Sequence, residues 1–434
     1  IIIKYEFYFC FYNFRTMKKY SLYLLFFALS CNKSEIPREL VLGDDVFDTG
    51  VVIDDKNFKK PCLDGFAGNY PCLGYDLLAQ ISLREFGSNS ANDNWGWKDP
   101  ETEKEYALLG LDDGTAFIDI SDPENPIFLG KLPTASTTSP WRDVKVFKNH
   151  AFIVSEAQNH GLQVFDLTKL RSVKNFEIFD SSATLTDFGN AHNIWINEES
   201  SFAYVLGSNL HAGGPVFIDI SDPKNPKNLG GYSRERYTHD AHVVNYIGPD
   251  PEFQGKEIFF GSNSDGGENN RIVILDVTDK LNPSIISTID YSGSGYTHQG
   301  FLTEDHRYFF LGDELDELKF GLKTQTRIFD FSILKEPKLH FKYFSNFDAI
   351  DHNGYIVGEY FFLANYSAGL RVIDISEVQN KTIFEKGFFD TYPSDNNPKF
   401  NGVWSIYPFF DSGVIAISDI DSGLFLVKAS AIDE

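Results

Sequence analysis

Hydrophobic residues occur along the chain in short runs rich in β-branched and aromatic side chains, and turn residues separate these runs. This pattern is typical of strands rather than helices. Seven of the runs align with one another: GTAFIDIS (114–121), GLQVFDLT (161–168), GPVFIDIS (214–221), RIVILDVT (271–278), QTRIFDFS (325–332), GLRVIDIS (369–376) and GLFLVKAS (423–430). Successive units are 44 to 57 residues apart, with a mean of about 52, so the chain is an internal repeat.

Each repeat contains four strand-like runs. Upstream of the aligned segment lie a hydrophobic run such as HAFIVSE and, before it, a run such as RDVKVF; Asp-Pro-x-Asn-Pro turns and a further run such as IFLGKL follow it. Four-stranded units repeated four to eight times describe a β-propeller. We therefore predict an all-β fold, a seven-bladed β-propeller of four-stranded antiparallel blades, with a long all-β solenoid as the alternative.

The closure of the ring is also predicted. The last repeat ends at Glu434, too soon for its own outer strand, whereas Tyr75 to Leu83 (YDLLAQISL) is a strand without a partner ahead of the first repeat. We expect this N-terminal strand to complete the last blade, which removes the exposed edges of an open array.

An Asp recurs at the sixth position of six repeats: Asp119, Asp166, Asp219, Asp276, Asp330 and Asp374. A catalytic carboxylate would not need six copies. We expect each to accept hydrogen bonds from backbone N–H groups in the turn that follows. Lys428 stands at this position in the seventh repeat, which predicts a differently capped last turn.

Composition and charge narrow the classes of protein and ligand that fit the chain. The chain is 42% hydrophobic and 15% aromatic, enough to fill a large core, so intrinsic disorder is excluded for most of it. Its 38 Lys and Arg against 62 Asp and Glu give a net charge of −24. That charge disfavours nucleic acid and anionic lipid surfaces and fits metal cations or neutral ligands better.

The N-terminal region predicts export. Residues 17–30 read as a signal peptide: Met17, two Lys, an apolar run and a small residue before Cys31. Ala28-Leu29-Ser30-Cys31 resembles a lipoprotein processing box, so Cys31 is the expected lipidation site, and ordinary cleavage and secretion is the alternative. Residues 1–16 are interpreted as non-native upstream translation, 31–61 as the lipidated N-terminus and tether, and 62–434 as the propeller domain.

Two further cysteines, Cys62 and Cys72, enclose a loop with two glycines in PCLDGFAGNYPC. In an oxidising compartment the expected outcome is a local disulfide. A metal site made of Cys alone would need more ligands.

Polar and aromatic residues cluster where the first strand of each repeat begins. In a propeller this strand is innermost, so we expect these side chains to converge on one mouth of the central channel. The predicted binding residues are Trp95, Trp141, Arg142, Asp143, His192, Asn193, His239, Asp240, His242, His298, Gln299, Asp351, His352 and Trp404, and Asn353 lies at the same strand start as His352. They form a structural polar mouth, a metal site or a catalytic site; these three alternatives remain open.

A possible divalent metal ion has two sets of predicted ligands. Imidazoles suit a transition metal, whereas an acidic run could hold Ca²⁺ or be simply a solvated loop. The candidates are His192, His239, His242, His298 and His352, and Asp313, Glu314, Asp316 and Glu317. The acidic run does not have the spacing of an EF-hand.

The ordered motifs CLDGFAGNYPC, NWGWKDPETEKEYALLGLDDGTAFIDISDPENP, YTHDAHVV, GSGYTHQGFLTEDHRYFFLGDELDE and FFDTYPSDNNPKFNGVWSIYP, among others between Cys62 and Val427, resemble the choice-of-anchor B family. The resemblance implies an exported bacterial propeller with LVIVD-type repeats, attached to the surface by a device that varies between members. It implies no settled biochemical activity.

Two functions fit these observations. The first is a binding module for an extracellular protein or glycan. It would be held at the outer membrane or cell surface only by its lipid anchor, or otherwise be secreted. Four aromatic residues could stack on sugars or pack in the core: Trp95, Trp97, Trp141 and Trp404. The second is a metal-dependent hydrolase or lyase, in which the five His would hold the ion and Asp240 or Asp351 would act as base. Fold alone does not choose between them.

Overall fold

The computed structural model describes residues 59–265, 267 and 269–431. The upstream segment 1–16, the signal peptide 17–30, the lipidation site Cys31 and residues 31–58 of the expected tether lie outside the described residues. No helix in the described part of the chain is both long and apolar enough to cross a membrane.

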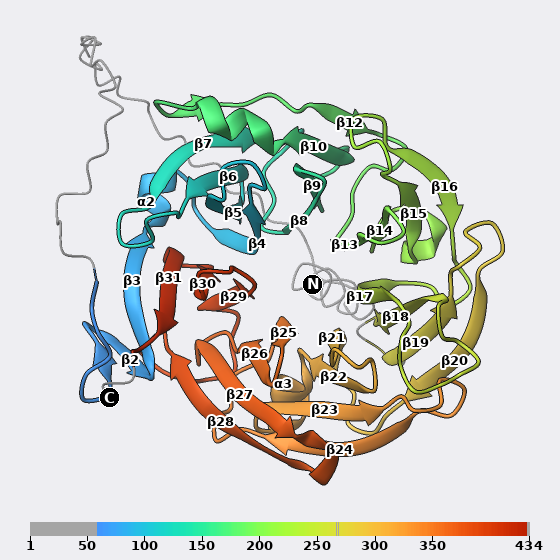
Figure 1. Cartoon of the computed structure of the whole chain (residues 1–434). Coiled ribbons are helices and arrows are strands. Elements are labelled where there is room, and N and C mark those ends of the chain that lie inside the picture. Colours follow the sequence, from blue (N-terminus) through green and yellow to red (C-terminus); the bar gives the residue numbers. More distant parts are fainter. Residues whose placement is uncertain (1–58, 266, 268, 432–434) are drawn as a thin grey trace, which may run out of the picture. The chain divides into compact units, whose positions relative to one another are not determined.

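Seven antiparallel sheets form the blades of a closed ring, which confirms the predicted propeller (Figure 1). The strands of each blade are given from the channel outward. Blade one consists of β4 (Ala91–Lys98), β5 (Glu105–Leu111), β6 (Gly114–Asp119) and β7 (Ile127–Pro133), and blade two of β8 (Arg142–Phe147), β9 (His150–Ser155), β10 (Leu162–Asp166) and β12 (Ala183–Leu185). Blade three consists of β13 (Asn193–Asn197), β14 (Phe202–Leu206), β15 (Val216–Asp219) and β16 (Lys227–Gly231). A short strand, β11 (Glu177–Ile178), pairs in parallel with β7.

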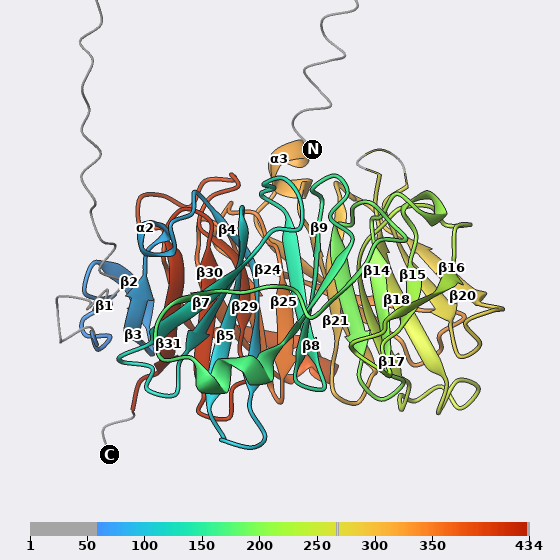
Figure 2. The same cartoon turned by 90° about the horizontal axis from the view of Figure 1, so that it is seen from above.

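Blades four to six follow the same order. Their strands are β17 (Thr238–Asn245), β18 (Glu257–Asn263), β19 (Arg271–Asp276) and β20 (Ser284–Asp290); β21 (Thr297–Leu302), β22 (Tyr308–Asp313), β23 (Gln325–Asp330) and β24 (Lys338–Phe344); and β25 (Gly354–Val357), β26 (Tyr360–Ala364), β27 (Leu370–Glu377) and β28 (Thr382–Phe389). The helical elements are short: α2 (Leu83–Phe86), α3 (Asp316–Phe320), and the 3-10 turns η1 (Leu167–Ser172), η2 (His211–Gly213) and η3 (Val378–Asn380). Helices α2 and α3 lie on the same side of the ring (Figure 2).

The seventh blade closes the ring as predicted. Its inner strands β29 (Val403–Tyr407), β30 (Val414–Asp419) and β31 (Gly423–Ala429) come from the C-terminal end, and its outer strand β3 (Tyr75–Ile81) comes from the N-terminal end. β3 pairs antiparallel with β31, from Tyr75 opposite Ala429 to Ile81 opposite Leu424. Two segments far apart in sequence therefore hold the ring shut.

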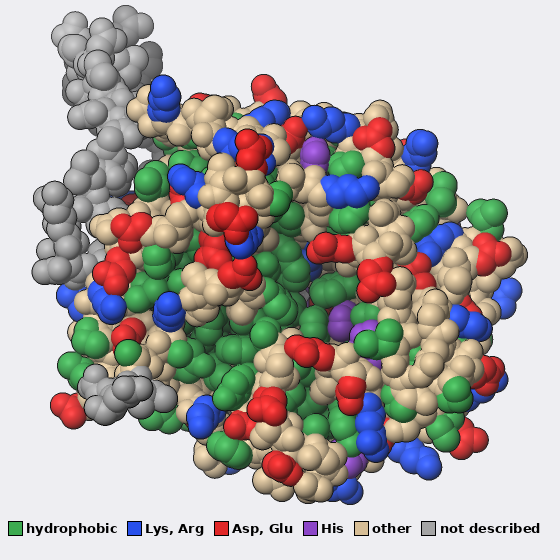
Figure 3. Space-filling view, viewed as in Figure 1, with side chains coloured by type: hydrophobic (Ala, Val, Ile, Leu, Met, Phe, Trp, Pro, Cys, Tyr) green, Lys and Arg blue, Asp and Glu red, His purple; other side chains and the backbone are tan. Residues whose placement is uncertain are grey.

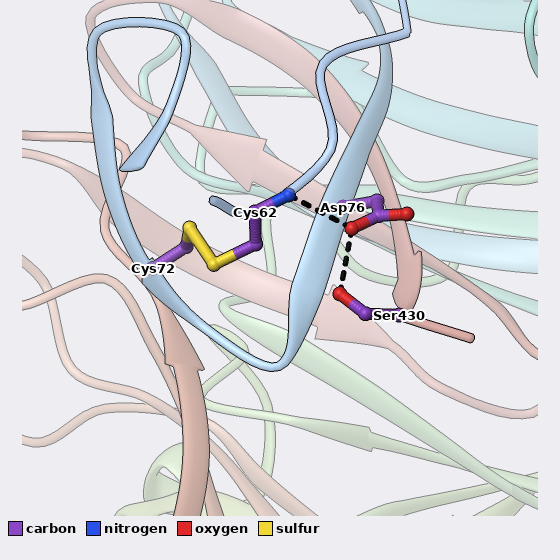
Figure 4. The surroundings of a disulfide bond; sticks show 4 residues. All are labelled: Cys62, Cys72, Asp76 and Ser430. Atoms are coloured by element: carbon purple, nitrogen blue, oxygen red, sulfur yellow. Dashed lines mark hydrogen bonds between the residues drawn. A yellow bond between two sulfur atoms is a disulfide. The ribbon is translucent and has the colours of Figure 1, made fainter. Parts of the chain in front are cut away.

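The N-terminal hairpin also reinforces blade six. β1 (Phe66–Ala67) pairs with β2 (Tyr70–Leu73), and β2 extends the sheet by pairing with β28. A disulfide joins Cys62 to Cys72 across this hairpin. The side-chain carboxylate of Asp76 accepts hydrogen bonds from the Cys62 backbone N–H and the Ser430 hydroxyl, at 2.9 and 2.6 Å (Figure 4). The hairpin, β3 and the C-terminal strand thus form one unit.

The recurring Asp caps its turn in all six repeats. In each case Oδ1 accepts the backbone N–H two residues later, as in Asp119 to Ser121 and Asp374 to Ser376, both at 3.0 Å. In the seventh repeat Lys428 is exposed, and Asp76 of β3, which lies opposite it, accepts from Ser430 instead. The closing strand therefore supplies the carboxylate that the last repeat lacks.

The core is divided among the junctions between neighbouring blades. Seven clusters of buried hydrophobic side chains occur, one at each blade–blade contact. Trp97 belongs to the cluster between blades one and two, where its ring stacks on Tyr106 at 4.9 Å. Core packing is therefore its role, and it is not available to stack on a sugar.

A charged clamp joins the first two blades. Arg171 of η1 donates two hydrogen bonds to the buried carboxylate of Asp99, at 2.6 and 2.8 Å. These bonds lower the pKa of Asp99 to about 2. Because the folded-state pKa lies below the unfolded value of about 3.9, the clamp stabilises the fold above that value and loses its effect as pH falls towards 2.

Replacing Arg171 with Met is expected to lower the free energy of unfolding at pH 7 by about 1.5–3 kcal/mol, the worth of hydrogen bonds to a charged group. Thermal melting at pH 7 and pH 3 measures the effect. The difference in melting temperature between the variant and the wild type should shrink at pH 3. A difference that stays constant between the two pH values would show that Asp99 is not the partner that matters.

Candidate functional site

The first strands of all seven blades line the central channel, and a small cavity opens among the residues with which they begin. We call it the channel cavity. Sixteen residues line it: Asp93, Trp141, Arg142, Asp143, Lys145, His192, Asn193, Trp195, His239, Asp240, His298, Gln299, His352, Asn353, Tyr355 and Trp404. Twelve of these were predicted from the starts of the first strands.

Four lining residues were missed: Asp93, Lys145, Trp195 and Tyr355. All four follow a signal that the sequence contains, because side chains two residues apart on a strand share a face. Lys145 lies two residues after Asp143, Trp195 two after Asn193, and Tyr355 two after Asn353, while Asp93 lies two before Trp95. Continuing this alternation inward from each strand start would have identified them.

Four histidines from successive blades form a continuous row along the cavity wall. The ring centroids of His192 and His239 are 4.1 Å apart, those of His239 and His298 4.3 Å, and those of His298 and His352 4.2 Å. Such close imidazoles are compatible only with mostly neutral rings, because neighbouring positive charges repel.

Hydrogen bonds at Nδ1 fix the orientation of several of these rings. His239 Nδ1 lies 3.1 Å from the carbonyl oxygen of His298, and His352 Nδ1 bonds the carbonyl oxygen of Trp404. A carbonyl only accepts, so Nδ1 is the protonated nitrogen and Nε2 keeps its lone pair. Each ring is thus held by the backbone of the following blade.

The pKa values separate one histidine from the other three. Burial and the neighbouring imidazoles lower the pKa of His239 and His298 well below the ordinary value, and burial lowers that of His352 to about 3. Burial alone would lower the pKa of His192 too, but its 2.7 Å contact with Glu156 outweighs this and raises it. His192 therefore holds its proton more readily than the other three.

Glu314, which follows β22, lies beside the row. Its Oε2 is 3.9 Å from His298 Nε2, and its Oε1 is 3.6 Å from His352 Nε2 and accepts a 2.9 Å hydrogen bond from the Tyr366 hydroxyl. Burial raises the pKa of Glu314 to about 7. One ligand atom each from His239, His298 and Glu314 lie within 4.8 Å of one another.

A buried ion cluster lies deeper in the channel cavity. Lys145 Nζ bonds Asp93 at 3.0 Å and Asp143 at 2.6 Å, and it lies 4.6 Å from the centre of the Trp95 ring. Asp143 also accepts the backbone N–H of Ile194 on the next blade. This cluster joins the inner strands of the first three blades.

Asp240 is the remaining buried carboxyl of the cavity wall. It accepts hydrogen bonds from the Ala241 N–H and from the Asn193 amide, the latter at 2.9 Å. Burial raises its pKa to about 6. Asp240 can therefore take up and release a proton close to neutral pH.

Trp95 and His242 were predicted at the mouth but lie in an aromatic layer further along the channel. Trp95 packs against Tyr407 at 5.1 Å, and His242 stacks on Phe301 at 4.0 Å. We define the aromatic layer by Trp95, Trp195, His242, Phe301, Tyr355, Tyr407 and Phe409. The face of the ring seen in Figure 3 is hollowed at its centre, where hydrophobic side chains gather.

Strand geometry explains why His242 lies further along the channel than the predicted mouth. A strand advances about 3.3 Å per residue, so His242 lies roughly 10 Å beyond His239 along the channel. His242 Nδ1 accepts the backbone N–H of Leu302 at 3.1 Å, and burial lowers its pKa to about 3. It is a core histidine and does not join the predicted metal ligands.

The acidic run after β22 is buried, which excludes the solvated loop. Asp313 accepts the backbone N–H groups of Gly295 and Tyr296, and Asp316 pairs with Arg327 at 2.7 Å. Burial raises the pKa of Glu317 to about 12, so this carboxyl is neutral at pH 7. Of the four acidic candidates, Glu314 alone contributes to a group of convergent ligand atoms within the described residues.

Asp351 does not line the channel cavity, although it was predicted to do so. Neighbouring residues in an extended segment point to opposite sides. His352 faces the cavity, whereas the Asp351 carboxylate is buried against Gly312. Burial raises its pKa well above the ordinary value, so Asp351 is not placed or charged to act as the base of a reaction in the cavity.

Comparison with known proteins agrees with this architecture. The LVIVD repeat matches residues 188–233 and 355–386, which correspond to blades three and six. No curated protein sequence matches the chain significantly.

Solved propellers share the fold at low identity. The β-propeller domain of Cps50 (Swd1) from Myceliophteria thermophila has a TM-score of 0.54 at 13% identity, over 82% of this chain and 100% of that one. A protein from Bacteroides fragilis suggested to be a 6-phosphogluconolactonase has a TM-score of 0.50 at 11% identity, over 70% of this chain and 84% of that one. Identities this low show the fold alone. The chain is therefore a seven-bladed β-propeller that carries LVIVD repeats.

Proposed function

We propose that this propeller is an exported binding module, held at the outer membrane or cell surface by a lipid on Cys31, and that its channel cavity binds one neutral sugar unit of an extracellular glycan. Export is supported by the signal-like sequence, by the resemblance to the choice-of-anchor B family and by the Cys62–Cys72 disulfide, a bond that persists in oxidising compartments.

The observation that carries the proposal is the makeup of the channel cavity. Its lining comes from the inner ends of all seven blades, so side chains of several kinds converge on one place. Two half-buried tryptophans, Trp141 and Trp404, line it together with amide, imidazole and carboxyl groups such as Asn193 and Gln299. Indole rings offer flat apolar surface for the C–H face of a sugar, and the polar groups match its hydroxyls.

The charge of the protein favours a neutral ligand. The chain carries a net charge of −24, and the cavity wall contains three carboxyls, Asp93, Asp143 and Asp240, against two cations, Arg142 and Lys145. A phosphorylated or strongly acidic ligand would be repelled. Neutral hexoses or N-acetylhexosamines meet no such penalty.

A glycan array followed by calorimetric titration of the strongest ligand tests this function. We expect Trp141→Ala and Trp404→Ala each to weaken binding at least tenfold, which corresponds to about 1.4 kcal/mol. Phe384→Ala is the matched control, because this aromatic is 51% exposed on the outer strand of blade six and should leave binding unchanged.

Two outcomes would contradict glycan binding. One is that no neutral glycan is retained by the folded protein; the other is that both Trp variants bind as the wild type does. Retention of extracellular proteins in place of glycans would move the function to protein recognition.

A metal-dependent hydrolase or lyase is the second candidate, favoured by the convergence of His239, His298 and Glu314. Asp351 is excluded as its base, whereas Asp240 lines the cavity with a pKa of about 6. Cleavage of retained glycans by the metal-loaded protein, in the same experiment, would support this function over simple binding.

A further inference from the structure

We propose that a divalent transition-metal ion binds in the wall of the channel cavity, between Nε2 of His239, Nε2 of His298 and the carboxylate of Glu314, with His352 as a neighbouring fourth donor. The site is independent of the ligand proposed above. It brings together two groups of residues that the sequence presents separately, the histidines of the inner strands and the acidic run after β22.

The first argument is distance. The three ligand atoms lie within 4.8 Å of one another, and Glu314 Oε1 is 3.6 Å from His352 Nε2. Donors about 2.0–2.2 Å from a tetrahedral ion are roughly 3.4 Å apart. Small side-chain rotations therefore bring the donors to coordination distance without moving the strands that carry them.

The second argument is orientation. In metal sites, a ligating histidine usually donates its other ring N–H to a carbonyl or carboxylate, which fixes the ring and directs its lone pair at the ion. His239 and His352 have this arrangement, with Nδ1 bonded to the carbonyls of His298 and Trp404. The hydrogen bond from Tyr366 orients Glu314 in the same way.

The donor set identifies the class of ion. Imidazole nitrogens with one carboxylate suit Zn²⁺, Fe²⁺, Ni²⁺ or Cu²⁺, whereas Ca²⁺ and Mg²⁺ prefer oxygen donors alone. His239, His298 and His352 all line the channel cavity.

The test uses the full chain without a histidine tag, stripped by chelator and titrated with Zn²⁺ by calorimetry and with Co²⁺ by visible absorption. We expect one Zn²⁺ per chain and a Co²⁺ spectrum in the visible. Glu314→Gln, which preserves shape, and His298→Gln should each weaken Zn²⁺ binding at least 100-fold. His340→Gln is the control, since His340 lies on the outer strand of blade five and bonds the carbonyl of Val378.

Thermal melting of the wild type keeps the proposal testable if a variant fails to fold. Zn²⁺ should raise the melting temperature and chelator should reverse the rise, because an ion that binds only the folded state stabilises it; Ca²⁺ at equal concentration should not. Absence of stoichiometric Zn²⁺ in the wild type, or unchanged affinity in folded Glu314→Gln and His298→Gln, would overturn the proposal. All of these measurements are made without glycan, so their failure would leave the glycan-binding function standing.

Discussion

The double variant Leu77→Ala, Leu78→Ala is expected to lose most of the stability of the closed ring. These neighbouring residues of β3 belong to two different core clusters: Leu77 packs between blades six and seven, and Leu78 between blades seven and one. Both are only 4% exposed. A buried Leu→Ala change costs about 2–5 kcal/mol, and the double variant should lose more than either single variant.

The consequences should be wider than those of an ordinary core substitution, because β3 pairs with the C-terminal strand β31 and so closes the ring. An opened ring exposes strand edges, so aggregation and proteolysis near blade seven are expected to accompany the lower melting temperature. Leu63→Ala is the control, since Leu63 lies in the same N-terminal hairpin region but is 65% exposed. Melting of the double variant at the temperature of Leu63→Ala would show that closure by β3 does not stabilise the propeller.

Replacing Lys145 with Met is expected to cost about 3–5 kcal/mol of unfolding free energy, because it leaves two buried carboxyls without their cation. Lys145, Asp93 and Asp143 are each at most 4% exposed, and the ammonium bonds both carboxylates. Burial alone would lower the pKa of Lys145, but the neighbouring charges of Asp143 and Asp93 outweigh it and raise the pKa, so Lys145 is charged at pH 7.

Two companion variants make this prediction specific. Adding Asp93→Asn and Asp143→Asn to Lys145→Met should restore much of the stability, since the uncompensated carboxyls are then removed. Lys335→Met is the matched control, because Lys335 and Glu252 form an ion pair in which both side chains are 54% exposed, and such pairs contribute about 0–1 kcal/mol. Chemical denaturation measures all of them. Equal midpoints for Lys145→Met and Lys335→Met would show that the buried cluster is not held by its cation.

The fold was largely predictable because the repeated segments show which strand of each blade they form. The aligned segments and the recurring Asp fix where the third strand of each blade ends, and six aspartates cap their turns as expected. The pairing of β2 with blade six was not predicted. A strand of four residues beside a disulfide has no repeat partner in the sequence, so its neighbour is decided only by tertiary packing.

The composition of the site was harder to predict than its position. The starts of the inner strands located the channel cavity, but depth along the channel depends on register and on bulges. One such irregularity, between Thr238 and Asp240, lets both His239 and Asp240 line the cavity. Glu314 comes from a different strand end, and no periodicity in the sequence connects it to His298.

The most direct test of whether the polar end of the channel is a metal site is anomalous diffraction. Diffraction from crystals of the Zn²⁺-loaded protein would be recorded on both sides of the zinc absorption edge. We expect one strong zinc peak about 2.0–2.2 Å from Nε2 of His239, Nε2 of His298 and an oxygen of Glu314. A channel cavity that is well ordered and without a zinc peak, or a peak that lies instead among Asp316, Glu317 and Asp351, would contradict it.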